Sequence, residues 1–182
     1  MATPFRRGFK TESTALVAEV RAEVGARLVD PLDPARVASA YGVPVVTAAQ
    51  LANGRPLVAP PEFSAMTVFR GSRRIIVLNS DHAPTRQRSS LAHELAHLLL
   101  EHEPARHLMD GARMWDPTAE READWMGAEL LVPRPAGLTI CRVGEVVDAA
   151  AARFGVSTQL LTWRLNASGA RAQAQREGGR SW

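Results

Sequence analysis

The chain has 182 residues, of which 46% are hydrophobic, a balance that suits one globular domain and excludes a disordered chain. No apolar run approaches the roughly 20 residues of a membrane span, and the single cysteine, Cys141, cannot form an internal disulfide. The first residues lack the apolar core of a secretory signal, so a cytoplasmic protein is expected. The formal net charge of +3 comes from scattered arginines, so direct binding to nucleic acid is not expected.

The first part of the chain predicts two helices behind a leader. Residues 1–12 are expected to form a flexible leader. Apolar residues then recur at helical spacing after Ser13 or Thr14, either of which can cap the helix. A second helix is expected to begin with Asp33 as its cap and Pro34 in its first turn, and to end at the next glycine.

The middle of the chain has the pattern of strands. Residues 44–49 predict one short strand. Residues 64–79 predict two strands that meet at Gly71, because β-branched residues flank a glycine-containing turn. A small, mainly antiparallel sheet is therefore expected.

Two longer helices are predicted after the strands. The first runs over about residues 86–101, with Thr85 as its cap. The second begins at Asp116 and Pro117, a capping residue followed by proline in the first helical position. It should end at the segment VPRP, where two prolines forbid continuation.

The last part of the chain predicts a helix pair and a tail. The pair is expected to break at Gly155. Residues 169–182 are rich in glycine and arginine and poor in apolar residues, so a disordered tail is expected there. Helices, strands and helices in this order predict a single α+β domain over residues 13–168.

One motif in the first long helix points to chemistry. His93, Glu94 and His97 form the pattern His-Glu-x-x-His inside an apolar run. Two histidines four residues apart lie on one face of a helix, so both imidazoles can reach a single ion. Glu94 lies beside that pair and can reach a metal-bound water. The alternative is a helix with two hydrogen-bonded structural histidines.

A third ligand is needed, because catalytic zinc commonly takes three protein ligands and one water. Glu120 and Asp124 lie four residues apart on the next long helix. Glu120 can be the third ligand, and Asp124 can accept a hydrogen bond from the free ring nitrogen of a ligand histidine. Glu122 is expected to point elsewhere, as a solvated charge. The alternative is that all three acids form an ordinary charged face.

Small residues on both helices predict that they approach closely. They are Ala92, Ala96, Ala123, Gly127 and Ala128. Such an approach would place the carboxylate of one helix beside the imidazoles of the other, in a dry and rigid surrounding that strengthens the effect of zinc on bound water.

The segments RQRSSLAHELAHLLLEH and EREADWMGAELLVP resemble the ImmA/IrrE family of bacterial and phage metallopeptidases, part of the gluzincin-type group. The resemblance implies a zincin-like fold, zinc ligation by His93, His97 and Glu120, and Glu94 as the catalytic base. Members of the family are often fused or genetically linked to helix-turn-helix repressors, which they cleave; the sequence shows no such module of its own. The family often has glycine at the position of Ala96, a departure that bears on substrate preference and leaves the ligands intact.

The expected function is therefore zinc-dependent cleavage of a protein substrate, with a repressor as the implied target. Three residues are candidates for stabilising the oxyanion: Tyr41, His102 and His107. Each is read equally well as a solvated or structural side chain. The peptide is expected to lie extended against the strand pair over residues 65–78.

Two other functions compete with cleavage. One is a zinc-bearing module that docks a partner, in the manner of an antitoxin, with little turnover. The other is a DNA-binding regulator, suggested by the arginine content. Zinc is the first choice for two imidazoles and a carboxylate, although another divalent ion fits the same donors.

Overall fold

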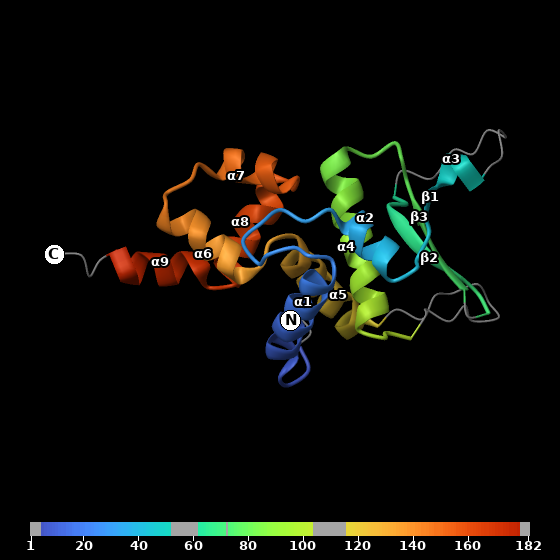
Figure 1. Ribbon diagram of the computed structural model, residues 1–182, viewed down its shortest axis with the longest axis horizontal. Helices are drawn as coiled ribbons and strands as arrows, with labels where there is room; N and C mark the ends of the chain where they lie inside the picture. Colours follow the sequence, from blue (N-terminus) through green and yellow to red (C-terminus); the bar gives the residue numbers. More distant parts are fainter. Residues whose placement is uncertain (1–4, 52–61, 72, 104–115, 179–182) are drawn as a thin grey trace.

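The computed structural model describes residues 5–51, 62–71, 73–103 and 116–178 (Figure 1). Within this part, the chain is mostly helical and also contains a three-stranded sheet, an α+β arrangement. The helices are α1 (Phe9–Glu23), α2 (Pro34–Ala40), α3 (Ala48–Leu51), α4 (Pro84–Leu99), α5 (Pro117–Leu131), α6 (Arg134–Arg142), α7 (Val147–Phe154), α8 (Thr158–Ala167) and α9 (Ala170–Gly178). The strands are β1 (Val45–Thr47), β2 (Ala65–Arg70) and β3 (Arg73–Leu78). No helix of the described residues combines the length and the apolar character needed to cross a membrane.

Helix α4 lies at the centre of the molecule, between the sheet on one side and α5 on the other (Figure 1). Its apolar residues pack against elements on both sides. Leu91 and Leu95 are buried in the same core cluster as Ile76 of β3, whereas Ala92 is buried in a second cluster with residues of α6, α7 and α8. The histidine-bearing helix is therefore held from several sides.

Helices α4 and α5 approach each other through Gly127, as the small residues predicted. A Cβ atom at Gly127 would lie 3.0 Å from the backbone carbonyl of Ala92 and from the backbone nitrogen of His93. Real Cβ atoms rarely come that close to backbone, so the absent side chain permits this packing. The close approach brings the acidic side chains of α5 within reach of the histidines.

The sheet has the strand order β1-β3-β2 and is mixed. Strands β2 and β3 pair antiparallel, with Ala65 opposite Leu78, and Gly71 in the turn has φ 62°. Strand β1 pairs with β3 in parallel, with Val45 opposite Ile76. The longer pairing is thus antiparallel, as expected, and the parallel pairing of β1 makes the sheet mixed. A tight hairpin forces antiparallel pairing, whereas the longer connection that includes α3 lets β1 lie parallel to β3.

The N-terminal residues differ from the expected flexible leader. Helix α1 begins at Phe9, which is fully buried and stacks on Phe5 with ring centroids 5.3 Å apart. The two expected caps lie inside the helix, and the hydroxyls of Ser13 and Thr14 each donate to Glu129 at 2.9 Å. The buried phenylalanine starts the helix earlier than helical spacing alone indicated.

Helix α9 occupies residues where a disordered tail was expected. It packs against α6, and the guanidinium of Arg142 binds the carboxylate of Glu177 at 2.8 Å and 3.0 Å. Ala170 at its start is fully buried. Contacts with a neighbouring helix thus order a segment with little apolar content of its own. Helix α6 was also not foreseen; it begins directly after Pro133.

The helix boundaries near the motif agree with the sequence in part. Asp116 caps α5 by accepting from the backbone nitrogens of Thr118 and Ala119, and Gly155 separates α7 from α8 with φ 63°, both as expected. Helix α4 begins earlier than expected, at Pro84, and Thr85 is not its cap. Proline itself favours the first helical position and moves the start forward.

Candidate metal centre

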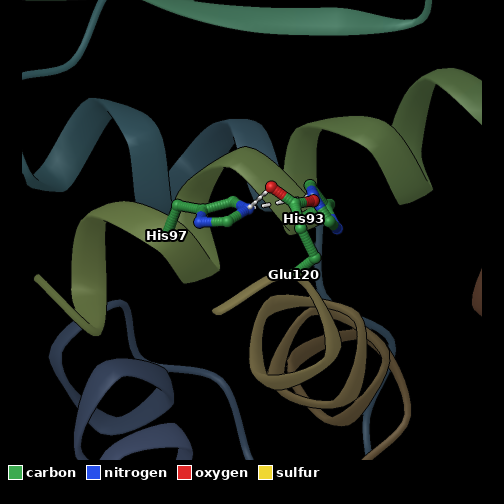
Figure 2. A group of neighbouring side chains, drawn as sticks. All are labelled: His93, His97 and Glu120. Atoms are coloured by element: carbon green, nitrogen blue, oxygen red, sulfur yellow. Dashed lines mark hydrogen bonds and ion pairs between the residues drawn. The ribbon is translucent and has the colours of Figure 1, made fainter. Parts of the chain in front are cut away.

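Three side chains from two helices converge on one point (Figure 2). The Nε2 atom of His93 lies 3.3 Å from Oε2 of Glu120, and the Nε2 atom of His97 lies 3.6 Å from Oε1. The two Nε2 atoms are 3.1 Å apart. Among the described residues, this is the group of histidine, cysteine and acidic side chains whose donor atoms are close enough to hold one ion.

The donor set fits zinc. Zinc bonds of about 2.0–2.1 Å arranged as a tetrahedron would place neighbouring donors about 3.3–3.4 Å apart. The two Nε2 atoms, 3.1 Å apart, and the Nε2 atom of His93 with Oε2 of Glu120, 3.3 Å apart, are close to that separation, and one donor atom of each residue lies within 4.8 Å of the others. Two imidazoles and one carboxylate are a common catalytic zinc set with a fourth position for water. His93, His97 and Glu120 could therefore hold a zinc ion.

Each helix presents its donors for a local reason. Helix α4 places His93 and His97 one turn apart on the side that faces α5 (Figure 2). Helix α5 starts at its cap Asp116, so Glu120 belongs to the first turn. The positive end of the helix macrodipole favours a carboxylate there.

Asp124, one turn of α5 beyond Glu120, lies against the ring of the first histidine. Its Oδ1 atom lies 2.9 Å from Nδ1 of His93. Burial opposes a charge on His93, but the hydrogen bonds with Asp124 and Glu120 outweigh it and raise the pKa of His93 to about 10. Hydrogen bonds from His93 and His97 lower the pKa of Glu120 to about 2. These carboxylates thus favour a positive charge between the two helices.

Glu94 follows His93 in α4, where its charge helps to raise the pKa of His93, and its side chain contacts the sheet. The hydroxyl of Thr67 on β2 donates to Oε2 of Glu94 at 2.7 Å. The sequence did not identify Thr67 as a site residue, because it lies 27 residues before Glu94 on a strand with no motif of its own. The contact brings β2 to the side of α4 that carries the acidic residue.

His102 lies behind His97. The Nδ1 atoms of the two rings are 3.0 Å apart, so His102 faces the side of the His97 ring opposite Nε2. The Nε2 atom of His102 lies 3.6 Å from Oε2 of Glu122. Burial and the neighbouring His97 lower the pKa of His102. This position does not suit the role of oxyanion donor considered for His102.

Neither of the other two candidates for the oxyanion donor is placed at the three donor residues by the structure. Tyr41 follows α2 and bonds to Glu23 at the end of α1; desolvation and this bond raise the pKa of Tyr41 to about 12. His107 lies outside the described residues.

Glu122 is buried, which corrects the expectation of a solvated charge. Only 2% of the residue is exposed. The side chain of Arg6 donates from Nε to Oε2 of Glu122 at 3.0 Å, and the backbone nitrogen of Arg6 donates to Oε1 at 3.3 Å. The N-terminal residues before α1 thus reach the helix that carries Glu120.

Sequence comparison identifies the family. Residues 38–166 match the IrrE N-terminal-like domain, a peptidase family. The chain belongs to this family. The matched range contains all three donor residues and Glu94, and the family confirms the resemblance seen in the two motif segments. Membership of a peptidase family agrees with a donor set that could hold a metal ion.

Structural comparison supports the fold of the domain. A Mycobacterium tuberculosis transcriptional regulator is similar to this IrrE N-terminal-like domain with a TM-score of 0.59 and 14% sequence identity. The similarity covers 86% of this chain and 46% of that one, so the chain spans about half the length of the regulator. At this identity the likeness concerns the fold alone. No curated protein sequence matches the chain.

Proposed function

We propose that the protein is a zinc-dependent endopeptidase that hydrolyses peptide bonds of a protein substrate. One observation carries the proposal: the donors of His93, His97 and Glu120 lie within 4.8 Å of one another in a chain of a peptidase family. Glu94 follows His93 directly in the chain and carries the acidic side chain that hydrolysis requires.

The chain's own residues divide the work of hydrolysis. His93, His97 and Glu120 would hold a zinc ion, which would supply Lewis-acid chemistry to polarise a carbonyl and lower the pKa of water to near 7. Glu94 accepts the proton of the attacking water and passes it to the leaving amine nitrogen. The hydrogen bond from Thr67 holds the carboxylate of Glu94 in place for both transfers. Asp124 keeps His93 in one orientation.

The substrate is proposed to bind as an additional strand on β2. Among the described residues, β2 pairs with β3 alone, so its other edge is available for an extended peptide. Thr67 of β2 contacts Glu94, and a peptide on this edge would therefore pass close to the proposed base. Val68 and Phe69 on the same strand are 43% and 41% exposed and offer apolar contacts to the peptide.

We further propose that the substrate is a DNA-binding repressor in a stress or mobile-element response, and that cleavage takes place in the cytoplasm. The support is the resemblance to the ImmA/IrrE peptidases and the similarity in fold to the Mycobacterium tuberculosis transcriptional regulator. A repressor encoded next to this chain is the first substrate to test.

The deciding experiment compares the wild-type protein with Glu94→Gln. Both proteins are purified without chelators, their zinc content is measured, and each is incubated with the repressor. The proposal expects about one zinc per chain in both proteins and cleavage by the wild type alone. His93→Ala and Glu120→Ala should lose zinc and activity together. Wild-type protein without stoichiometric metal would overturn the proposal.

Glu94→Gln also distinguishes the peptidase from the alternative, a zinc-bearing module that docks a partner. Such a module needs no acidic side chain beside the ion. If the protein is a docking module, the Glu94→Gln variant would therefore keep its zinc and would have the same biological effect as the wild type. Loss of the effect with retained binding to the partner supports the peptidase.

A further inference from the structure

The further inference rests on the proposed function and concerns the second histidine ligand. A ligand histidine commonly donates from its other ring nitrogen to an acceptor that fixes the ring. Asp124 meets this need for His93. For His97, the atom at the corresponding position is the ring nitrogen of His102, 3.0 Å away.

The direction of this hydrogen bond depends on which ring nitrogen of His97 would bind the ion. His97 directs Nε2 toward Glu120, so this nitrogen must keep its lone pair for the metal. The proton of a neutral His97 is then on Nδ1, which donates to Nδ1 of His102. His102 consequently carries its own proton on Nε2, which faces Oε2 of Glu122 at 3.6 Å.

Glu122 can act as the terminal acceptor because Arg6 compensates its burial. A carboxylate that is 2% exposed is costly unless a cation and hydrogen bonds accompany it. Arg6 supplies two hydrogen bonds, from its Nε and its backbone nitrogen. Its guanidinium is held in turn by Glu12 of α1 at 2.7 Å and 2.8 Å.

The end of α4 brings His102 back to His97. The backbone nitrogen of His102 donates to the carbonyl of His97 at 3.0 Å, and Glu101 has φ 53°. This is the helix-ending turn in which a residue in the left-handed region folds the chain back on the last turn. A glutamate there costs conformational energy, which the contact between the two imidazoles helps to offset.

We propose that His102, Glu122 and Arg6 form a chain of positioning residues that orients His97 for metal binding. The segment before α1 is thereby part of the metal centre. None of the three touches the substrate in the proposed reaction. Their effect passes through the imidazole of His97 and appears first in zinc affinity.

The test is a double-mutant cycle on zinc affinity, measured by competition with a chromophoric chelator on the full chain. His102→Phe keeps ring volume and removes both the hydrogen bond with His97 and the contact with Glu122, and should weaken zinc binding about tenfold to hundredfold. Arg6→Gln should weaken it by about threefold to tenfold. Because both act along one route, the double variant should bind zinc no more weakly than His102→Phe alone.

Two further variants serve as controls. Arg7→Gln changes the neighbouring exposed arginine and should leave zinc affinity unchanged. His102→Gln keeps one acceptor and one donor and should recover part of the affinity that His102→Phe loses. If His102→Phe does not fold, Glu122→Gln takes its place in the cycle with Arg6→Gln.

The outcomes separate the inference from the proposed function. If the wild-type protein binds zinc, and His102→Phe and Arg6→Gln bind it as tightly as the wild type, the inference is overturned and the proposed function stands. Additive penalties in the double variant also overturn it, because they indicate separate routes. Wild-type protein that binds no zinc overturns the proposed function and the inference together.

Discussion

The hydroxyl of Thr67 on β2 donates to the carboxylate of Glu94 on α4 across 2.7 Å. This bond joins the edge strand to the residue next to His93, the first of the two candidate histidine ligands. It therefore connects the proposed substrate surface with the proposed base. The bond is charge-assisted, and such bonds are shorter and stronger than neutral ones.

Thr67→Val should lower kcat about tenfold and leave zinc affinity unchanged. Valine keeps the shape of threonine but cannot hold the carboxylate of Glu94 in one orientation. The loss corresponds to about 1.4 kcal/mol in the transition state. Steady-state cleavage and zinc titration of both proteins check it, with Thr47→Val on β1 as the matched control. An unchanged kcat would exclude a positioning role for Thr67.

Zinc binding should release about one proton per ion near pH 8. Without metal, the pKa of His93 is raised to about 10, so the folded chain holds a proton on this ring at pH 8. The metal must displace it, because a ligand imidazole is neutral. The pKa of Glu120 lies at about 2, so this carboxylate is already deprotonated near pH 8 and has no proton to release. Calorimetry in buffers of different ionisation enthalpy measures the proton count.

The same pKa predicts how the metal-free protein responds to pH. His93 has a folded pKa of about 10 and an ordinary value of 6.5. Its contribution to stability is fully present below pH 6.5 and is lost as the pH rises through 10. Chemical unfolding in the presence of a chelator should therefore show a decline over this range. The decline should disappear in His93→Gln.

Gly127→Val should weaken both the fold and the metal centre. The first added carbon already lies 3.0 Å from the backbone of Ala92 and His93, so α5 must move away from α4. Overpacking of this kind costs about 1–3 kcal/mol. The shift also moves Glu120 from the histidines, so zinc affinity should fall. Urea unfolding and zinc titration measure the two effects, and an unchanged zinc affinity would contradict the account.

Glu129→Ala should destabilise the protein by about 3–5 kcal/mol, because it leaves the guanidinium of Arg164 buried without its partner. The two side chains are 2.8 Å apart and almost fully buried. Glu145→Ala removes a surface pair with Arg153 and should cost less than about 1 kcal/mol. Urea unfolding of both variants gives the comparison. Equal losses would show that burial of the pair is not decisive.

The donor residues were predictable from the sequence because their relationship is local. His93 and His97 are one helical turn apart, and Glu120 follows the cap of α5 at a fixed distance along the helix. Asp124 is one further turn along α5, so its place beside His93 followed from the same helical period. Short-range geometry of this kind depends little on the rest of the fold.

The supporting residues could not be predicted, because tertiary packing alone brings them to the site. Arg6 and Glu122 are 116 residues apart, and no pattern in either segment marks the pair. Glu122 looked like a solvated acid because its neighbours on α5 are charged. The parallel pairing of β1 with β3 was missed for a similar reason, since a three-residue strand carries no signal for its direction.

The bond between Arg6 and Glu122 also imposes an order of events during biosynthesis. Arg6 leaves the ribosome early, but its partner is made 116 residues later. His93 and His97, the proposed histidine ligands, are therefore synthesised before Glu120 and before Glu122, the partner of Arg6. An ion captured at that stage would have two protein ligands, and tight retention would begin only when α5 docks.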